Sequence, residues 1–206
     1  SGWVMCVFCE QTLSTPFFRN PACITERTDH VSTSRKRQTQ VGRRSLYLKN
    51  LEILDVLVVL IGVKLDLLEV DRPREELVHE LDWHFRNFDG IIEKYNIEKI
   101  KTIGDAYMCA GGLPIRNRSN PIDVVLAGLE ICNFIEDIKE MKKQRGEQYW
   151  DIRIGIHSGP LVAGVVGKTK WAYDIWGNTV NTANRLESTA TPGYVNISEF
   201  TYQQVK

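Results

Sequence analysis

Residues 98–114 read EKIKTIGDAYMCAGGLP, two short apolar stretches that meet at Gly104-Asp105. A glycine beside an acidic residue between such stretches is typical of a tight turn, so residues 97–103 and 106–110 are predicted to form a β-hairpin. The turn would hold the carboxylate of Asp105 beyond the sheet edge, where it could bind a hard cation such as magnesium. Aspartate is also simply a good turn residue, and the spacing alone favours that second interpretation.

Amphipathic helices are predicted on both sides of this hairpin in the chain. Pro73 begins one helix, whose apolar residues recur at three-to-four spacing, and Pro121 begins another that ends near Gly146. Upstream, residues 56–63 form a compact, β-branched apolar run, which is typical of a strand buried on both faces.

The C-terminal third also alternates between strand and helix patterns. Residues 150–157 and 161–166 are predicted to be hairpin strands separated by Ser158-Gly159-Pro160. A helix is expected over 177–189, and a further strand precedes Ser198, which caps a last helix. Strands joined by hairpins and covered by such helices predict an α+β fold, a ferredoxin-like, antiparallel-rich sheet with helices on one face.

The chain divides into two regions of different character. Residues 1–50 are rich in Ser, Thr and Arg and show no useful periodicity, so they are expected to be a poorly structured or aberrant N-terminal segment. Residues 51–206 are expected to form one domain, incomplete at its C-terminus.

Composition excludes several classes of protein. The formal net charge is +0 and 43% of the residues are hydrophobic, which gives no reason to expect nucleic-acid binding or membrane binding. The longest apolar run is far shorter than the roughly 20 residues that span a bilayer. Five cysteines at irregular spacing favour a reducing, cytoplasmic compartment over a disulfide framework.

A second informative stretch is residues 173–187, YDIWGNTVNTANRLE. On a helix, Asn181 and Arg185 are one turn apart and leave the same face. An amide beside a guanidinium suits a phosphate ester, because Arg neutralises spread anionic charge and Asn can orient a sugar oxygen. A solvated polar face would explain the same residues equally well.

These stretches together resemble the class III adenylyl and guanylyl cyclases, including the bacterial-type adenylate cyclases. The resemblance runs from about residue 73 to residue 206 and rests on four motifs in the family's order and spacing. They are Glu-Glu-Leu at 75–77, residues 98–114, residues 151–167 (DIRIGIHSGPLVAGVVG) and residues 173–187.

The resemblance implies a reaction in intracellular signal transduction. In the family, two Mg²⁺ or Mn²⁺ ions held by two aspartates activate the ribose 3′-hydroxyl for attack on the α-phosphorus, and pyrophosphate leaves. Asp105 matches the second metal-binding aspartate, Asn181 the ribose-orienting asparagine and Arg185 the arginine that stabilises charge on the α-phosphate. The family also implies a homodimer with composite active sites at the subunit interface.

Lys101 and Asp174 occupy the family's two base-reading positions. Adenine offers an acceptor at N1 and a donor at its 6-amino group, which a Lys donor and an Asp acceptor complement. Guanine reverses that pattern, and guanylyl cyclases usually carry Glu and Cys there. The pair therefore predicts an adenylyl cyclase that converts ATP to 3′,5′-cyclic AMP, in the cytoplasm, with a parent protein that a region outside this chain could anchor to a membrane.

The chain departs from the family upstream. The first metal-binding aspartate is expected near Ile61 and is not found there; Asp55 and Asp66 are the nearest carboxylates, and neither fits the register. A shifted reading frame or an erroneous gene model upstream of residue 73 would explain this, and so would a degenerate metal site. Two alternatives to an active adenylyl cyclase stay open: an impaired cyclase-like module for nucleotide binding or dimerisation, and a guanylyl cyclase.

Overall fold

The structure is a computed structural model and describes residues 4–7, 52–64, 73–166 and 172–206. Its helices and strands, in chain order, are β1 (Val4–Val7), β2 (Glu52–Lys64), α3 (Arg74–Lys94), β3 (Glu98–Ile103), β4 (Ala106–Gly111), α4 (Asn120–Gln144), β5 (Asp151–Val166), β6 (Ala172–Trp176), α5 (Asn178–Ser188), β7 (Val195–Ser198) and α6 (Glu199–Val205).

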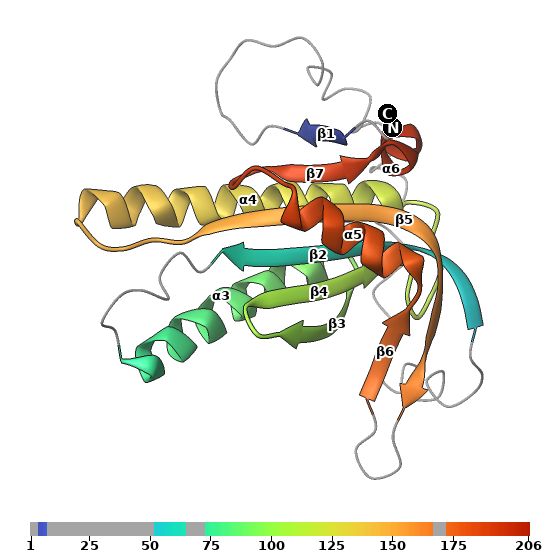
Figure 1. The fold of residues 1–206 in the computed structure, drawn as a ribbon, viewed down its shortest axis with the longest axis horizontal. Coiled ribbons are helices and arrows are strands. Elements are labelled where there is room, and N and C mark those ends of the chain that lie inside the picture. The colour runs from blue at the N-terminus through green and yellow to red at the C-terminus, as the bar shows by residue number, and fades with distance from the viewer. Residues whose placement is uncertain (1–3, 8–51, 65–72, 167–171) are drawn as a thin grey trace. The chain divides into compact units, whose positions relative to one another are not determined.

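The strands form one mixed sheet (Figure 1). Its order is β1-β7-β5-β2-β4-β3, and β6 pairs with β5 off this path. All neighbours are antiparallel except β5 and β7, which are parallel. The core of the sheet, β5-β2-β4-β3, has α3 between β2 and β3 and α4 between β4 and β5, which is the ferredoxin-like arrangement. The predicted fold class is confirmed.

Local signals in the sequence account for the element ends. The predicted hairpin has its turn at Gly104, where φ is +61°, a conformation that glycine adopts without a Cβ penalty. The two helices predicted from proline starts are α3 and α4, with acidic residues in the first turn of each. Ser198 caps α6, because its Oγ accepts a hydrogen bond from the Thr201 amide at 3.2 Å.

Helices cover both faces of the sheet, so the expectation of helices on one face is wrong in that detail. Ile154 and Ile156 of β5 point toward α4, where they lie 3.7 Å and 3.3 Å from the Cβ position of Gly128. The residue between them, Gly155, faces α5 instead, and a Cβ there would lie 2.8 Å from Glu187 Cα. Figure 1 shows α5 in front of the sheet and α3 and α4 behind it. An apolar stripe identifies a buried helix face, but it does not identify which side of the sheet the helix covers.

Two hydrophobic clusters follow from this layering. The larger one lies between the sheet and α3 and α4, and its fully buried members include Phe88, Tyr107, Ile131 and Ile152. The smaller one lies under α5 and contains Met108, Ala110, Leu113, Leu161, Ala163, Ile175 and Ala183. The two clusters hold β4 and β5 from opposite sides. Those two strands and their neighbours carry the candidate site.

The predicted break at residues 158–160 is wrong, because β5 is one strand that stays paired with β2 from Asp151 to Ala163. The glycine and proline there receive a helix. A Cβ at Gly159 would lie 2.7 Å from Thr179 Oγ1, and that hydroxyl donates a hydrogen bond to the Pro160 carbonyl at 2.6 Å. The residues that resemble a turn in the sequence therefore accommodate the start of α5.

Two further points concern the N-terminal part of the chain. Residues 4–7 form β1 beside β7, a strand that the sequence analysis did not predict, and the rest of the segment 1–50 lies outside the described residues. The strand predicted at 56–63 is confirmed as β2. None of the described helices is both long and apolar enough to cross a membrane.

Candidate active site

Lys101 and Asp174, the predicted base-reading pair, are in contact. Lys101 lies on β3 and Asp174 on β6, far apart in the sequence, and Lys101 Nζ donates to Asp174 Oδ2 at 2.6 Å. The other carboxylate oxygen, Oδ1, accepts a hydrogen bond from the Ile175 amide at 2.8 Å, which fixes the orientation of the group. The side chains are 38% and 18% exposed, so the pair lies at the surface, open to a ligand.

A second polar cluster stiffens the hairpin that carries Lys101. The Tyr107 hydroxyl donates to Asp89 Oδ1 at 2.5 Å, and Lys99 pairs with the same carboxylate at 2.8 Å. Burial raises the pKa of Tyr107 above its usual value, and the hydrogen bond to Asp89 acts in the same direction, so the phenol stays protonated and donates. This contact ties β4 to α3 and holds the hairpin in place.

Asp105 lies at the turn of that hairpin, half-buried, as predicted. The end of β2 runs beside it, because Ile61 pairs with Tyr107 and Gly62 with Ala106. The neighbouring positions of β2 therefore hold Ile, Gly and Val where the resemblance expects an aspartate. Asp55 pairs with Pro160 instead, and Asp66 lies outside the described residues.

These residues do not fit a two-ion metal site. Asp105 is the one carboxylate that the described residues supply at the junction of β2 with the hairpin, and they contain no group of three or more His, Cys, Asp or Glu side chains that could hold a metal ion. A pair of divalent ions needs oxygen ligands from at least two such groups. The expectation of two ions stays a prediction.

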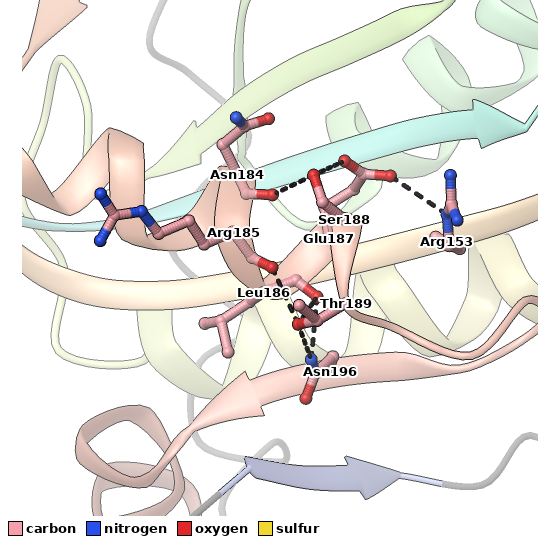
Figure 2. Close-up of polar contacts among 8 residues, drawn as sticks. All are labelled: Arg153, Asn184, Arg185, Leu186, Glu187, Ser188, Thr189 and Asn196. Atoms are coloured by element: carbon pink, nitrogen blue, oxygen red, sulfur yellow. Dashed lines mark hydrogen bonds and ion pairs between the residues drawn. The ribbon is translucent and has the colours of Figure 1, made fainter. Parts of the chain in front are cut away.

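Asn181 and Arg185 lie one turn apart on α5, as predicted, and both are exposed. No hydrogen bond or ion pair to the Arg185 guanidinium is found among the described residues, although the Arg185 carbonyl accepts bonds from Thr189. Figure 2 shows the guanidinium extending away from Arg153 and Asn196, which lie on neighbouring strands. The two side chains are thus available to an anionic ligand, whereas Lys101 and Asp174 contact each other.

The backbone of α5 lies directly on β5. Because Gly155 has no side chain, Glu187 and Ala183 can approach the strand more closely than any Cβ would allow. Glu187 Oε1 also forms an ion pair with Arg153 Nε of β5 at 3.4 Å. That Nε makes no hydrogen bond among the described residues, so the contact is purely electrostatic.

His157 does not belong to this group of side chains. Its Nδ1 lies 2.7 Å from Ser198 Oγ, and that hydroxyl lies 2.9 Å from Thr201 Oγ1, so the histidine connects β5 to the cap of α6. Burial lowers the pKa of His157 below its usual value. The sequence analysis missed the residues that support α5, namely Gly155, Arg153 and Asn196. Only the last had a signal, as a polar residue inside an apolar strand.

Comparison with known proteins identifies the family. The adenylate and guanylate cyclase catalytic domain matches residues 63–206, more than half of the chain, so the chain belongs to this family. Human guanylyl cyclase C is 43% identical over 132 residues, which are 64% of this chain and 12% of that protein. Human retinal guanylyl cyclase 2 is 44% identical over 124 residues, which are 60% of this chain and 11% of that protein.

Solved structures agree with this assignment. The chain matches a rhodopsin-guanylyl cyclase catalytic core with converted specificity, in complex with ATPαS, at a TM-score of 0.67 and 30% identity over 77% of this chain and 85% of that one. It also matches the adenylyl cyclase CyaB from P. aeruginosa, at a TM-score of 0.71 and 25% identity over 76% of this chain and 83% of that one. The chain is therefore a nucleotide cyclase catalytic domain, and its relatives include both guanylyl and adenylyl cyclases.

Proposed function

We propose that this domain is an adenylyl cyclase, which converts ATP to 3′,5′-cyclic AMP and pyrophosphate. The observation that carries the proposal is the contact between Lys101 and Asp174. It joins a donor and an acceptor, 2.6 Å apart, at the surface of β3 and β6. The Nζ has two further protons to donate, and the carboxylate has further lone pairs to accept a hydrogen bond.

This pair matches the edge of adenine. The ammonium can donate to N1 while the carboxylate accepts from the 6-amino group. Guanine would bring its O6 acceptor toward the carboxylate and its N1 donor toward the ammonium, so both contacts would be repulsive. A site built for hydrogen bonds rejects a base that leaves its buried groups unpaired, by up to roughly 10⁴-fold to 10⁵-fold. Because the pair is neutral overall, covering it with a base costs less than covering a lone charge.

Asn181 and Arg185 would act on the rest of the nucleotide. In the proposed reaction the ribose 3′-oxygen bonds to the α-phosphorus while the bond from that phosphorus to the pyrophosphate breaks. Asn181 orients the ribose, and Arg185 stabilises the negative charge that grows on the α-phosphate oxygens. Their spacing of one helical turn suits adjacent groups of one ligand.

The metal requirement remains a proposal with a specific difficulty. Members of this family are expected to use two Mg²⁺ or Mn²⁺ ions, but the described residues offer only Asp105 beside the end of β2. No step is therefore assigned to a metal. An impaired, nucleotide-binding module is the second candidate function, and this lack of a second carboxylate favours it.

We also propose a homodimer in which each site combines residues of both subunits, in the cytoplasm. The matched region is a small part of its relatives, one of which is named a receptor-type guanylate cyclase. By analogy, we propose that the parent of this domain is anchored to a membrane.

Product analysis tests the proposal. The purified chain is incubated with ATP or GTP, each with Mg²⁺ or Mn²⁺, and both cyclic nucleotides are measured. The proposal expects cyclic AMP in excess of cyclic GMP. The reverse excess would favour a guanylyl cyclase, the activity that the names of guanylyl cyclase C and retinal guanylyl cyclase 2 give. Binding of ATP without either product would establish the impaired module.

A further inference from the structure

We propose that Asn196 is a positioning residue for Arg185: it fixes the last turn of α5 and thereby the direction of the guanidinium. The inference rests on the proposed function for its catalytic consequence. Asn196 lies on β7, does not touch the candidate site with its own side chain, and is fully buried at 0% exposure. Its effect on the chemistry would be indirect.

Two hydrogen bonds connect Asn196 to the end of α5 (Figure 2). Its Nδ2 donates to the Leu186 carbonyl at 2.8 Å and to Thr189 Oγ1 at 3.4 Å. The Thr189 hydroxyl in turn donates to the Arg185 carbonyl at 2.8 Å. Carbonyls in the last turn of a helix have no partner within the helix, so a buried donor there fixes a turn that would otherwise fray. The chain of contacts ends on the backbone of Arg185 itself.

The sheet register makes Asn196 part of a larger support. Asn196 pairs with Gly155 in the parallel ladder between β7 and β5, so the two residues occupy neighbouring positions facing α5. Gly155 allows close contact with Glu187, and Arg153 of the same strand forms the ion pair with Glu187. Two strands thus hold the end of α5 on its inner side, while Arg185 projects from the outer side.

Stability alone does not explain an asparagine at this position. Its Oδ1 is buried and has no hydrogen-bond partner among the described residues. A buried acceptor without a partner costs about 1–3 kcal/mol, a cost that leucine, of similar size, would avoid. The feature that asparagine adds is its donor, and that donor is directed at the turn that carries Arg185.

The test is a double-mutant cycle between Asn196→Leu and Arg185→Ala, read as cyclic AMP formation. Because Arg185 acts on charge that develops in the transition state, Asn196→Leu is expected to lower kcat at least tenfold and to leave KM for ATP nearly unchanged. In the Arg185→Ala background the same change is expected to have little further effect, since a positioning residue has nothing left to position. Equal falls in kcat in both backgrounds would overturn the inference.

Two further variants separate positioning from general destabilisation. Thr189→Val removes the hydroxyl that links Asn196 to Arg185 and changes an exposed residue, so it avoids the risk of misfolding and should lower kcat in the same direction. Thr201→Val is the matched control, because Thr201 is also fully buried but bonds to Ser158 and Ser198, away from α5. A loss of kcat in this control as large as in Asn196→Leu, at a similar melting temperature, would overturn the inference.

Hydrogen exchange gives a readout that needs no activity. The amides of Thr189 and Ala190 donate to carbonyls of the last turn of α5, and both should exchange at least tenfold faster in Asn196→Leu but not in Thr201→Val. Unchanged exchange in Asn196→Leu would show that Asn196 does not fix this turn. A wild-type chain that makes no cyclic nucleotide would contradict the proposed function, and the exchange rates would then decide the positioning inference by themselves.

Discussion

Replacing Gly155 with alanine should displace the helix that carries Asn181 and Arg185. The added Cβ would lie 2.8 Å from Glu187 Cα, and closer still to Glu187 N and Ala183 O, whereas ordinary contact begins at 3.4 Å. These neighbours are backbone atoms of a helix and cannot rotate away. The end of α5 must therefore move outward by at least about 0.6 Å, the difference between those two distances. Overpacking of this kind costs about 1–3 kcal/mol of stability.

The displacement should cost more in catalysis than in stability. Misplacement of a catalytic group by about 1 Å can lower a rate 10²-fold, so kcat for Gly155→Ala is expected to fall between tenfold and 100-fold while the protein still folds. Thermal unfolding and initial rates of cyclic AMP formation, measured on the same preparations, check the two effects. Gly90→Ala is the matched control, because it is a helical glycine with nothing within 4 Å of its Cβ, and it should gain about 0.5–1 kcal/mol. Wild-type stability and kcat in Gly155→Ala would refute the close approach of α5 to β5.

Three predictions concern stability. Burial lowers the pKa of His84 from 6.5 to about 4, so the stability that its neutral form provides is fully present above pH 6.5 and is lost as the pH falls toward 4; His84→Phe should remove about 3 kcal/mol of that acid sensitivity, measured by urea unfolding across this range. Tyr107→Phe should cost about 1–2 kcal/mol, because it leaves Asp89 without the phenol donor, and an equally stable variant would contradict that contact. Ser198→Ala should cost about 1 kcal/mol through loss of the α6 cap, which faster exchange of the Thr201 amide would verify.

The sequence was sufficient for elements whose signals are local. The turn at Gly104-Asp105 and the helix starts at proline depend on backbone preferences of a few residues, and the structure has these features where they were predicted. The spacing of Asn181 and Arg185 likewise required only helical geometry. The contact between Lys101 and Asp174 could not follow from spacing alone, since β3 and β6 are distant in the chain, and it was expected only from the family resemblance.

Elements whose signals depend on tertiary contacts were not predicted correctly. Gly159 and Pro160 have the composition of a turn, but they lie in a continuous strand because α5 packs there through Thr179. The apolar stripe of α5 is equally compatible with either face of the sheet. The supporting role of Asn196 depends on which carbonyls come within reach after folding, and a single polar residue in an apolar strand does not specify them.

The most direct test of the proposed function is base selectivity in the double variant Lys101→Glu and Asp174→Cys. The ratio of kcat/KM for ATP to kcat/KM for GTP is measured for this variant and for the wild type. If Lys101 and Asp174 bind adenine, the wild type prefers ATP and the variant loses at least about 100-fold of that preference, as expected for two charge-assisted hydrogen bonds. An unchanged ratio, or a wild type that prefers GTP, would contradict the assignment of these two residues to the adenine edge.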